Sequence, residues 1–464
     1  MSQVLKYPFI SSDTAGDPRV QDTVAAVIAD IRANGDEAVR RYSEKFDHWS
    51  PAAFRLSKQE IAEALSSIPE TSLDDLRFAQ QQIQGFAQAQ RDSIRDFEVE
   101  TIKGVFLGQR TLPVDTAGAY IPGGRYPLAA SAHMTILTAR VAGVKRIAAA
   151  TPPSNGDLPP ITIAAMHLAG ADEIYVLGGV QAVVALALGT ESIDPVDIIT
   201  GPGNAYVSEA KRQLFGEIGI DLLAGPTETL IIADDDADPL TIAVDLLGQA
   251  EHGPDSPCIL ITTSETVGRT VQAHIDELLP GLATGDIAGQ AWRNHGEVHV
   301  TDSLDEAFAL ADSFASEHVQ VLTRDPRQAL ESLHHFGSLF LGERTCVPYG
   351  DKVIGTNHVL PTRRAARYTG GLWVGRFLKT VTYQEIREDV SSAQLGEICG
   401  RLSRLEHFEG HARSADLRAA KFGGAELSWI SPSSGGQYDD AAIAAADAAP
   451  RQADQNFQLP HRFA

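Results

Sequence analysis

The sequence has few cysteines and no long apolar run. Its three cysteines, Cys258, Cys346 and Cys399, are scattered over 464 residues and form no CxxC pair, which excludes a disulfide framework. No apolar run reaches the roughly 20 residues that a membrane-spanning helix needs. The first six residues lack the basic and apolar regions of a secretory signal. These absences predict a protein of the reducing cytoplasm.

Basic residues are also scarce, with 38 Lys and Arg against 61 Asp and Glu and a formal net charge of −23. Nucleic-acid binders carry a basic footprint, and anionic lipid attracts basic segments, so the charge argues against both partners. Hydrophobic residues make up 43% and charged residues 21%, as in ordinary globular proteins. The length fits about three domains of roughly 150 residues.

Hydrophobic periodicity predicts an α/β fold. A helix fits residues 18–47, with Gly35 interrupting it, and one or two surface helices fit residues 58–97. From Val114 onward, short β-prone runs alternate with helical stretches, which favours parallel sheets in two blocks. The predicted strands cover residues 117–121, 146–150, 173–177, 197–200, 229–233, 258–262, 298–301, 319–322 and 338–341. Beyond about residue 432 the Ser/Gly- and Ala/Asp-rich composition predicts a solvated tail or a weak helix.

A Gln-x-x-His pair ends one of the predicted helices. Asp238 and Pro239 fit the start of this helix, and Gly253 fits the position just past its end. Gln249 and His252 stand three residues apart in the last turn and therefore share one side. The negative end of the helix dipole suits a cation, so both residues could bind one metal ion. A histidine that merely caps the helix explains the same pattern.

Two further segments carry residues typical of active sites. Glu317 and His318 are adjacent at a predicted helix-to-strand junction, where they could form an acid/base pair. An adjacent Glu and His also occur often by chance. The Gly-, Asn- and Thr-rich stretch 349–376 predicts an irregular loop that contains Asp351 and His358, both possible zinc ligands. The same loop carries Arg363, Arg364 and Arg367, which could bind an anion or could pair with local carboxylates.

A Gly-rich turn and a pair of histidines complete the candidates. The run Gly201-Pro202-Gly203-Asn204 opens a predicted helix, and such a turn can hold phosphate, although it lacks the GxGxxG spacing. His407 and His411 stand four residues apart near the C-terminal helix. Either of them could be a metal ligand or merely an exposed side chain.

Taken together and in order, five runs resemble the histidinol dehydrogenase family over residues 15–425. They are GAYIPGGRYPL, ITGPGNAYVSEAKRQLFGEIGIDLLAGPTE, DLLGQAEHGPDS, SEHV and GDKVIGTNHVLPT. The resemblance implies a zinc-dependent, NAD-linked enzyme that oxidises a primary alcohol through an aldehyde to a carboxylate, using two NAD and one water. It also implies an intertwined homodimer with two incomplete Rossmann-like domains, parallel-rich sheets and small terminal segments.

The resemblance divides the chain into five parts. The first Rossmann-like domain, which carries the zinc and catalytic residues, comprises residues 20–119 and 227–371, and the second, which binds NAD, comprises residues 120–226. An N-terminal arm (1–19), a helical dimerisation segment (372–432) and a flexible tail (433–464) complete the division.

The resemblance also assigns site residues, with one zinc ion per subunit. The implied zinc ligands are Gln249, His252, Asp351 and His411, and the implied catalytic pair is Glu317 and His318. The implied substrate contacts are Thr227, His358 and Glu406, and the implied NAD contacts are Tyr120, Pro122, Gln181 and Asn204. Glu406 and His411 would reach the partner subunit's site. Thr227 stands where the family has Ser and keeps the hydroxyl group.

These roles agree with elementary chemistry. Zinc is redox-inert and can polarise an alcohol, while NAD accepts the hydride. An imidazole near neutrality can take the alcohol proton, and Glu317 can activate the water that the second oxidation needs.

The segment after GTNHVLPT indicates the substrate. It reads RRAARYTGGLWVGRFLKTVTYQ, which is more basic than typical histidinol enzymes and resembles the sulfopropanediol 3-dehydrogenase branch. That branch oxidises 2,3-dihydroxypropane-1-sulfonate to 3-sulfolactate in organosulfonate degradation. Histidinol is a cation, whereas guanidinium groups favour an anion. We therefore expect one or more of Arg363, Arg364 and Arg367 to bind the sulfonate of a small anionic alcohol. The alternatives are L-histidinol in histidine biosynthesis, another small polar alcohol, or a non-catalytic protein that kept the fold.

Overall fold

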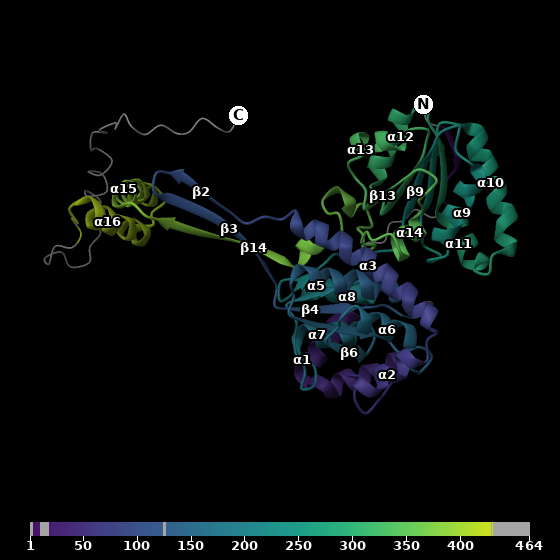
Figure 1. Ribbon diagram of the computed structural model, residues 1–464, viewed down its shortest axis with the longest axis horizontal. Coiled ribbons are helices and arrows are strands. Elements are labelled where there is room, and N and C mark those ends of the chain that lie inside the picture. Colours follow the sequence, from purple (N-terminus) through teal and green to yellow (C-terminus); the bar gives the residue numbers. More distant parts are fainter. Residues whose placement is uncertain (1–2, 10–17, 124–126, 428, 430–464) are drawn as a thin grey trace. The chain divides into compact units, whose positions relative to one another are not determined.

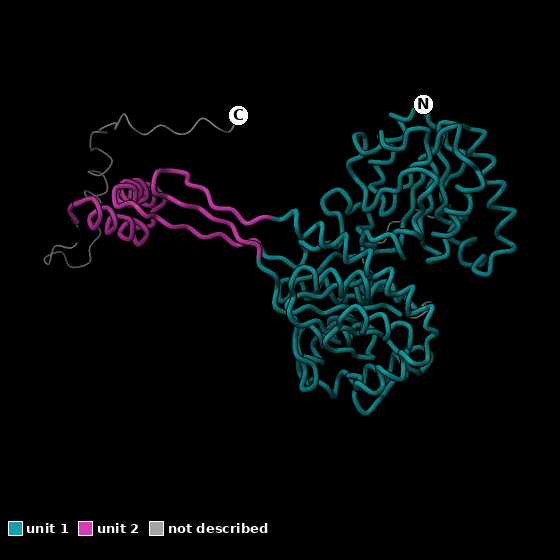
Figure 2. The backbone as a smooth tube through the Cα atoms, viewed as in Figure 1, with its two compact units in different colours: residues 1–94, 112–379 teal, residues 95–111, 380–464 magenta. Residues whose placement is uncertain are grey.

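The computed structural model describes residues 3–9, 18–123, 127–427 and 429, so the predicted tail at 433–464 lies outside the described residues. The chain forms two compact units (Figure 2). The first comprises Met1–Ile94 and Leu112–Lys379, and the second comprises Arg95–Thr111 and Thr380–Ala464. Within the described residues, no helix is long and apolar enough to cross a membrane.

A six-stranded sheet forms one part of the first unit (Figure 1). Its order is β1-β11-β10-β9-β12-β13, and only β1 runs antiparallel, along β11. The strands are β1 (Gln3–Lys6), β9 (Thr229–Ala233), β10 (Cys258–Thr262), β11 (Gly296–Val300), β12 (His318–Leu322) and β13 (Ser338–Leu341).

Helices cover both faces of this sheet because its central strands are apolar on both sides. Ile231 and Leu260 pack with one group of helices, whereas their neighbours Leu230 and Ile261 pack with another. The first group is α9 (Pro239–Ala250), α10 (Glu265–Leu278) and α11 (Gly285–His295). The second group is α12 (Leu304–Phe314) and α13 (Ala329–Ser332).

A five-stranded parallel sheet forms the other part of the first unit, in the order β6-β5-β4-β7-β8. Its strands are β4 (Thr116–Tyr120), β5 (Arg146–Thr151), β6 (Glu173–Val176), β7 (Ile198–Thr200) and β8 (Gly219–Ile220). One face is covered by α1 (Pro18–Asp47), α7 (Gly179–Leu188) and α8 (Ala205–Leu214). The other face is covered by α2 (Lys58–Ser66), α3 (Glu70–Asp92), α4 (Ala129–Ala132), α5 (Thr138–Ala142) and α6 (Pro160–Leu168).

The second unit combines an antiparallel ribbon with a helical hairpin. The ribbon has the order β14-β3-β2, and its strands are β2 (Phe97–Ile102), β3 (Val105–Pro113) and β14 (Leu378–Ile386). The hairpin consists of α15 (Asp389–Leu405) and α16 (Glu409–Gly423). The two helices approach closely at Gly396, where a Cβ would lie 2.7 Å from the carbonyl oxygen of Ala415.

The predicted α/β class with parallel-rich sheets is confirmed. The helix over residues 18–47 has the predicted bounds, and Gly35 interrupts it with φ 47° and ψ −131°. The predicted strands at 229–233, 258–262 and 338–341 have the observed bounds. Helices α1–α3 pack on the five-stranded sheet because their apolar faces match it. The domain division expected from the family resemblance differs at this point. It placed residues 20–119, which contain these three helices, in one domain with residues 227–371.

Candidate active site

The predicted catalytic pair lies at the amino ends of the central strands of the six-stranded sheet. His318 is the first residue of β12 and pairs in register with Thr229, the first residue of β9. Glu317 precedes it, and both side chains are buried. Glu228, the residue before β9, therefore lies beside both of them.

The imidazole of His318 is held in one tautomer. Its Nδ1 lies 3.1 Å from the carbonyl oxygen of Glu228. A carbonyl oxygen only accepts, so we assign the proton to Nδ1 and the lone pair to Nε2. Nε2 is buried, has no hydrogen-bond partner among the described residues, and lies 3.8 Å from Asp351 Oδ1. Burial lowers the pKa of His318 to about 4, so the ring is neutral and can accept a proton.

Glu317 is placed as a second proton-transfer group. Its Oε2 accepts the main-chain N–H of Glu228 at 3.0 Å and lies 3.6 Å from His318 Nδ1. Burial raises the pKa of Glu317 well above its ordinary value, with the nearby carboxylates of Glu228 and Asp351 adding to the effect. A carboxyl group with a raised pKa is a stronger base once ionised, as water activation requires.

The predicted metal ligands of the first unit lie near this pair. Gln249 is in the last turn of α9, and its buried Oε1 has no hydrogen-bond partner among the described residues. His252 follows the end of the helix and is exposed, whereas Asp351 is buried on α14 (Val347–Lys352). A buried amide oxygen without a donor, an imidazole and a carboxylate form a donor set that suits zinc. Within the described chain, no three His, Cys, Asp or Glu side chains form a metal site by themselves.

His358 lies between Asp351 and the five-stranded part of the unit. Its Nδ1 is 3.0 Å from the main-chain oxygen of Asp351 and 3.8 Å from that residue's Oδ1. Its Nε2 lies 3.3 Å from Ser131 Oγ. The neighbouring Asn357 donates its side-chain amide to the carbonyl oxygen of Met134 at 2.9 Å. Met134 belongs to the π-helical turn His133–Leu137, so this loop is attached to an irregular helix of the kind often found at functional sites.

The predicted NAD contacts lie at the carboxyl ends of the five-stranded sheet. Tyr120 ends β4, and its hydroxyl accepts the N–H of Gly179 at 3.1 Å. Gln181, buried in α7, donates to Asp47 at 2.8 Å and leaves its own Oε1 without a partner among the described residues. Asn204 caps α8 and remains exposed, and Pro122 follows β4 by two residues.

A buried ion pair missed by the sequence analysis fixes the glycine turn after β7. Asp221 Oδ2 accepts the N–H of Gly201 at 2.7 Å, and Lys211 Nζ donates to the carbonyl oxygen of Gly201 at 3.0 Å. The side chains of Lys211 and Asp221 also pair with each other. Gly201 has φ 119°, and a Cβ there would collide with the carbonyl oxygen of Tyr120. Lys211, in the run NAYVSEAKR, is the sequence feature that could have indicated this ion pair.

The arginine segment contacts the loop that precedes β9. Arg363, Arg364 and Arg367 are exposed, and none of them forms an ion pair with another described residue. The side chain of Arg363 lies against Gly225, where a Cβ would meet its Nε at 2.5 Å. Thr227, the predicted substrate contact, lies two residues further along this loop and is partly buried.

The remaining two predicted residues belong to the second unit. Glu406 caps the end of α15, and His411 lies on α16 with its ring 5.1 Å from that of Phe408. Both side chains are exposed within this unit. The structure therefore leaves them available, and their roles at the site stay predictions.

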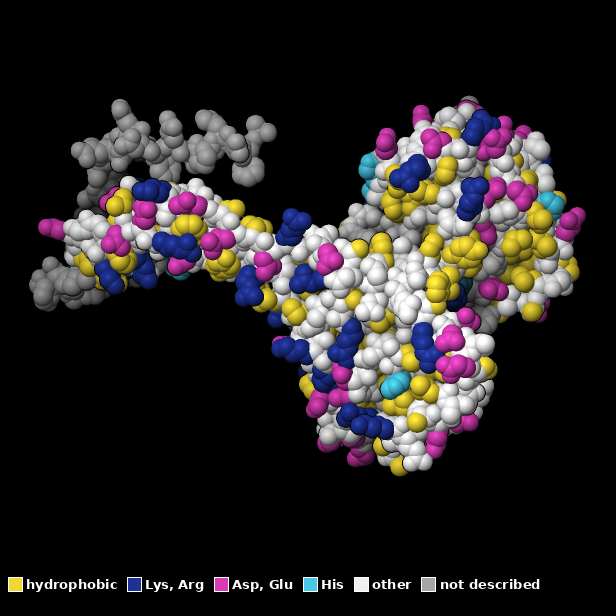
Figure 3. Space-filling view, viewed as in Figure 1, with side chains coloured by type: hydrophobic (Ala, Val, Ile, Leu, Met, Phe, Trp, Pro, Cys, Tyr) yellow, Lys and Arg dark blue, Asp and Glu magenta, His cyan; other side chains and the backbone are white. Residues whose placement is uncertain are grey.

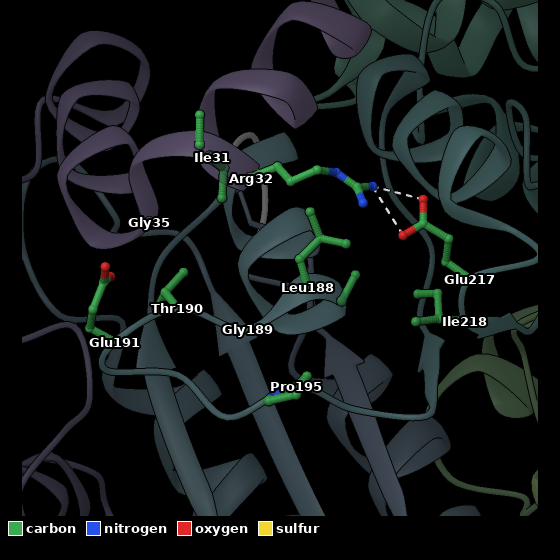
Figure 4. Close-up of a pocket in the computed structure, with 12 residues that line it drawn as sticks. Ile31, Arg32, Gly35, Leu188, Gly189, Thr190, Glu191, Pro195, Glu217 and Ile218 are labelled. Atoms are coloured by element: carbon green, nitrogen blue, oxygen red, sulfur yellow. Dashed lines mark hydrogen bonds and ion pairs between the residues drawn. The ribbon is translucent and has the colours of Figure 1, made fainter.

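A hollow on the five-stranded part holds none of the predicted residues (Figure 4). It lies between α1 and the segment from the end of α7 to Pro195. Its charges are satisfied within the chain, since Arg32 donates to Glu217 at 2.7 Å and Glu191 accepts the N–H of Asp36 at 2.8 Å. We therefore do not assign this hollow to the cofactor.

Comparison with known proteins identifies the family. The sequence model of the family described as histidinol dehydrogenase matches residues 11–419. The chain belongs to the histidinol dehydrogenase family. Members of this family are NAD-dependent oxidoreductases that act on CH–OH donors, and the family binds zinc in general.

Relatives within the histidinol dehydrogenase family carry different names. A "Histidinol dehydrogenase homolog" of Shouchella clausii is 56% identical and is covered to 95%, with 87% of this chain matched. A "Sulfopropanediol 3-dehydrogenase" of Ruegeria pomeroyi is 45% identical over 90% of this chain and 96% of its own length. The crystal structure of histidinol dehydrogenase from Elizabethkingia anophelis has a TM-score of 0.84 and 33% identity, covering 89% of this chain and 94% of that one. The family match and this structural similarity therefore establish the family and the fold.

Proposed function

We propose that the protein is a zinc- and NAD-dependent dehydrogenase that oxidises 2,3-dihydroxypropane-1-sulfonate through the aldehyde to 3-sulfolactate. The observation that carries the proposal is the buried imidazole of His318, whose Nε2 lies 3.8 Å from Asp351 Oδ1 and has no hydrogen-bond partner among the described residues. Such a group accepts a proton from an alcohol in a site that excludes water.

Each oxidation removes a hydride and a proton. In the first, His318 Nε2 takes the hydroxyl proton while the carbon gives its hydride to NAD. The resulting aldehyde adds one water, and Glu317 takes a proton from that water or from the hydrate. The second hydride then passes to a second NAD, which leaves the carboxylate. In total, alcohol, two NAD⁺ and water give the carboxylate, two NADH and three protons.

Gln249, His252 and Asp351 would hold the zinc ion, together with the partner subunit's His411. When bound, zinc would polarise the alcohol oxygen. Gln249 Oε1 supports this assignment because a buried amide oxygen normally has a donor, and this one has none in the part of the chain that the structure describes. Part of His252 reaches the surface, yet desolvation by the surrounding protein lowers the pKa of its imidazole, which favours the neutral form that binds a metal.

We assign NAD to residues 120–226, which form much of the five-stranded part, and the chemistry to residues 227–371. The strand order β6-β5-β4-β7-β8 is the order 3-2-1-4-5 within this sheet, as in dinucleotide-binding folds. Tyr120, Gln181 and Asn204 lie at the carboxyl ends of its strands, where such folds bind their ligand.

Arg363 supports an anionic substrate. Its side chain lies against Gly225 in the loop 225–228, and its guanidinium forms no ion pair with another described residue. Burial raises the pKa of Glu228 to about 7, and the nearby charge of Arg363 partly opposes this rise. An unpaired guanidinium suits the sulfonate oxygens. The 45% identical sulfopropanediol 3-dehydrogenase agrees with this reading, while a 42% identical histidinol dehydrogenase of the same bacterium, Ruegeria pomeroyi, makes histidinol the second candidate.

We also propose a homodimer in which the second unit supplies Glu406 and His411 to the partner subunit's site. Large apolar side chains of this unit are exposed, among them Val390 (63%), Leu402 (56%) and Leu405 (66%). Figure 3 shows apolar side chains among the charges of this unit. A second copy of the chain would cover them.

We also propose a cytoplasmic location for the protein. The free thiols of Cys258, Cys346 and Cys399 support it, because the cytoplasm keeps thiols reduced.

One assay tests the substrate. Zinc-loaded protein is mixed with NAD and either 2,3-dihydroxypropane-1-sulfonate or L-histidinol, and NADH formation is followed. We expect two NADH for each sulfonate diol and little NADH from histidinol. The reverse preference would replace the proposed substrate, and Arg363→Ala should raise KM for the sulfonate diol but leave the affinity for NAD unchanged.

A further inference from the structure

Two segments that are distant in the sequence interlock beside the catalytic pair. The N–H of Arg363 donates to Glu228 Oε1 at 2.7 Å, and the N–H of Gly225 donates to Thr362 Oγ1 at 2.5 Å. The arginine side chain fills the space that a Cβ at Gly225 would need. The loop 225–228 and the turn that begins at Thr362 therefore hold each other in place.

This turn has a backbone that needs support. Arg363 and Arg364 have φ angles of 53° and 63°, so two successive non-glycine residues occupy the left-handed region. Such residues persist only where the surroundings hold them. Two acceptors do so here: the Glu228 carboxylate binds the N–H of Arg363, and the carbonyl oxygen of Thr362 binds the N–H of Ala365 at 3.0 Å.

The main chain of Glu228 holds both members of the catalytic pair. Its N–H donates to Glu317 Oε2 at 3.0 Å, and its carbonyl oxygen lies 3.1 Å from His318 Nδ1. The same carbonyl oxygen accepts the main-chain N–H of His318 at 3.2 Å. Glu228 thus contacts the proton-transfer groups through its backbone and the arginine turn through its side chain.

We propose that Glu228 is a positioning residue that couples anion recognition at Arg363 to the Glu317–His318 pair. The inference rests on the proposed function, because it assumes that the anionic group of the alcohol binds Arg363. With the turn held by the carboxylate, the guanidinium stays over the loop 225–228, and the bound alcohol is kept at a fixed distance from His318 Nε2. The main chain of Glu228 holds the catalytic pair, and its side chain holds the arginine turn. Only the side-chain contact depends on the residue type, so a substitution can change it alone.

A matched pair of substitutions tests the side-chain contact. Glu228→Gln keeps an oxygen acceptor for the N–H of Arg363, whereas Glu228→Met has a similar length and no such acceptor. Glu331→Gln, on the exposed surface of α13, serves as the control. For each variant, kcat and KM for the sulfonate diol, the Kd for NAD and the thermal midpoint are measured on the zinc-loaded full chain.

We expect Glu228→Met to raise KM at least tenfold with kcat within threefold of wild type, and Glu228→Gln to stay close to wild type. In an Arg363→Ala background, Glu228→Met should raise KM no further, because the side chain it positions is gone. The Kd for NAD should not change in any variant.

Three results would overturn the inference. They are equal effects of Gln and Met, a loss confined to kcat, or additive effects of Glu228→Met and Arg363→Ala on KM. If Glu228→Met does not fold, Glu228→Gln and Arg363→Ala still test the inference. A tenfold rise in KM in Glu228→Gln would show that the charge of Glu228 matters and not its acceptor oxygen. A wild-type enzyme that fails to oxidise the sulfonate diol would refute the proposed function instead, before any variant is compared.

Discussion

The two sheets of the first unit present opposite ends of their strands to the candidate site. On the five-stranded sheet, Tyr120 and the turn at Gly201 lie at carboxyl ends, where α7 and α8 begin. On the six-stranded sheet, Glu317 and His318 lie at amino ends, near the last turn of α9. Helix N-termini attract the negative pyrophosphate, whereas helix C-termini attract a cation. The same β-α succession can therefore serve a dinucleotide or a metal ion, depending on which edge is used.

The largest expected effect comes from replacing His318, at the amino ends of the six-stranded sheet. His318→Asn should lower kcat by about 10³-fold, because positioned proton transfer contributes about 10²–10⁴-fold. NADH formation from the alcohol gives the rate. His334→Asn, an exposed histidine of the same unit, is the control and should change kcat less than twofold. A tenfold or smaller loss in His318→Asn would remove this residue from the proton-transfer step.

Glu317 should separate the two oxidations. Glu317→Gln keeps an acceptor oxygen for the N–H of Glu228 but cannot take a proton from water. We expect the first NADH to form within about tenfold of the wild-type rate, and the second to slow by about 10²-fold or more, so that aldehyde accumulates. Trapping the aldehyde with a hydrazine reagent and counting NADH per alcohol measures this. Two NADH per alcohol at wild-type rate would show that another group activates the water.

The carboxyl-end edge is tested at the buried ion pair. Lys211→Met leaves Asp221 buried without its cation, and breaking such a pair costs about 3–5 kcal/mol. We expect a lower thermal midpoint and a Kd for NAD raised about tenfold, because Gly201 is no longer held on both sides. Lys211→Met/Asp221→Leu should recover part of the stability but not the affinity. An unchanged Kd in the double variant would show that the ion pair supports only the fold.

The smallest effect concerns pH and stability. Burial lowers the pKa of His133, on the five-stranded side, to about 4, below its ordinary value of 6.5. Below pH 6.5 the unfolded chain binds a proton that folded His133 refuses, so this contribution to stability is present above pH 6.5 and falls toward pH 4. His133→Asn should flatten the decline by up to about 1.4 kcal/mol per pH unit. Unlike His318→Asn, it should leave kcat within about twofold. Unfolding in urea at several pH values measures the slope, and an unchanged slope would contradict the assignment.

Sequence patterns predicted the parallel strands well because their cores are continuous apolar runs, as at 229–233 and 258–262. They missed the antiparallel ribbon, since β2 and β14 expose nearly every side chain and show no alternation. Among site residues, His318 and Gln249 stood in recognisable motifs. Glu228 was missed, although it follows Thr227 directly, because its contacts to Glu317 and Arg363 arise only when three segments fold together.

Strand β1 has a consequence for handling the protein. Gln3–Lys6 pair along the outer side of β11, which would otherwise present a row of free main-chain N–H and C=O groups. Bare sheet edges recruit strands from other molecules and promote aggregation. Removing this short segment should therefore reduce solubility before it reduces activity, and an affinity tag belongs where it leaves residues 3–6 free to pair.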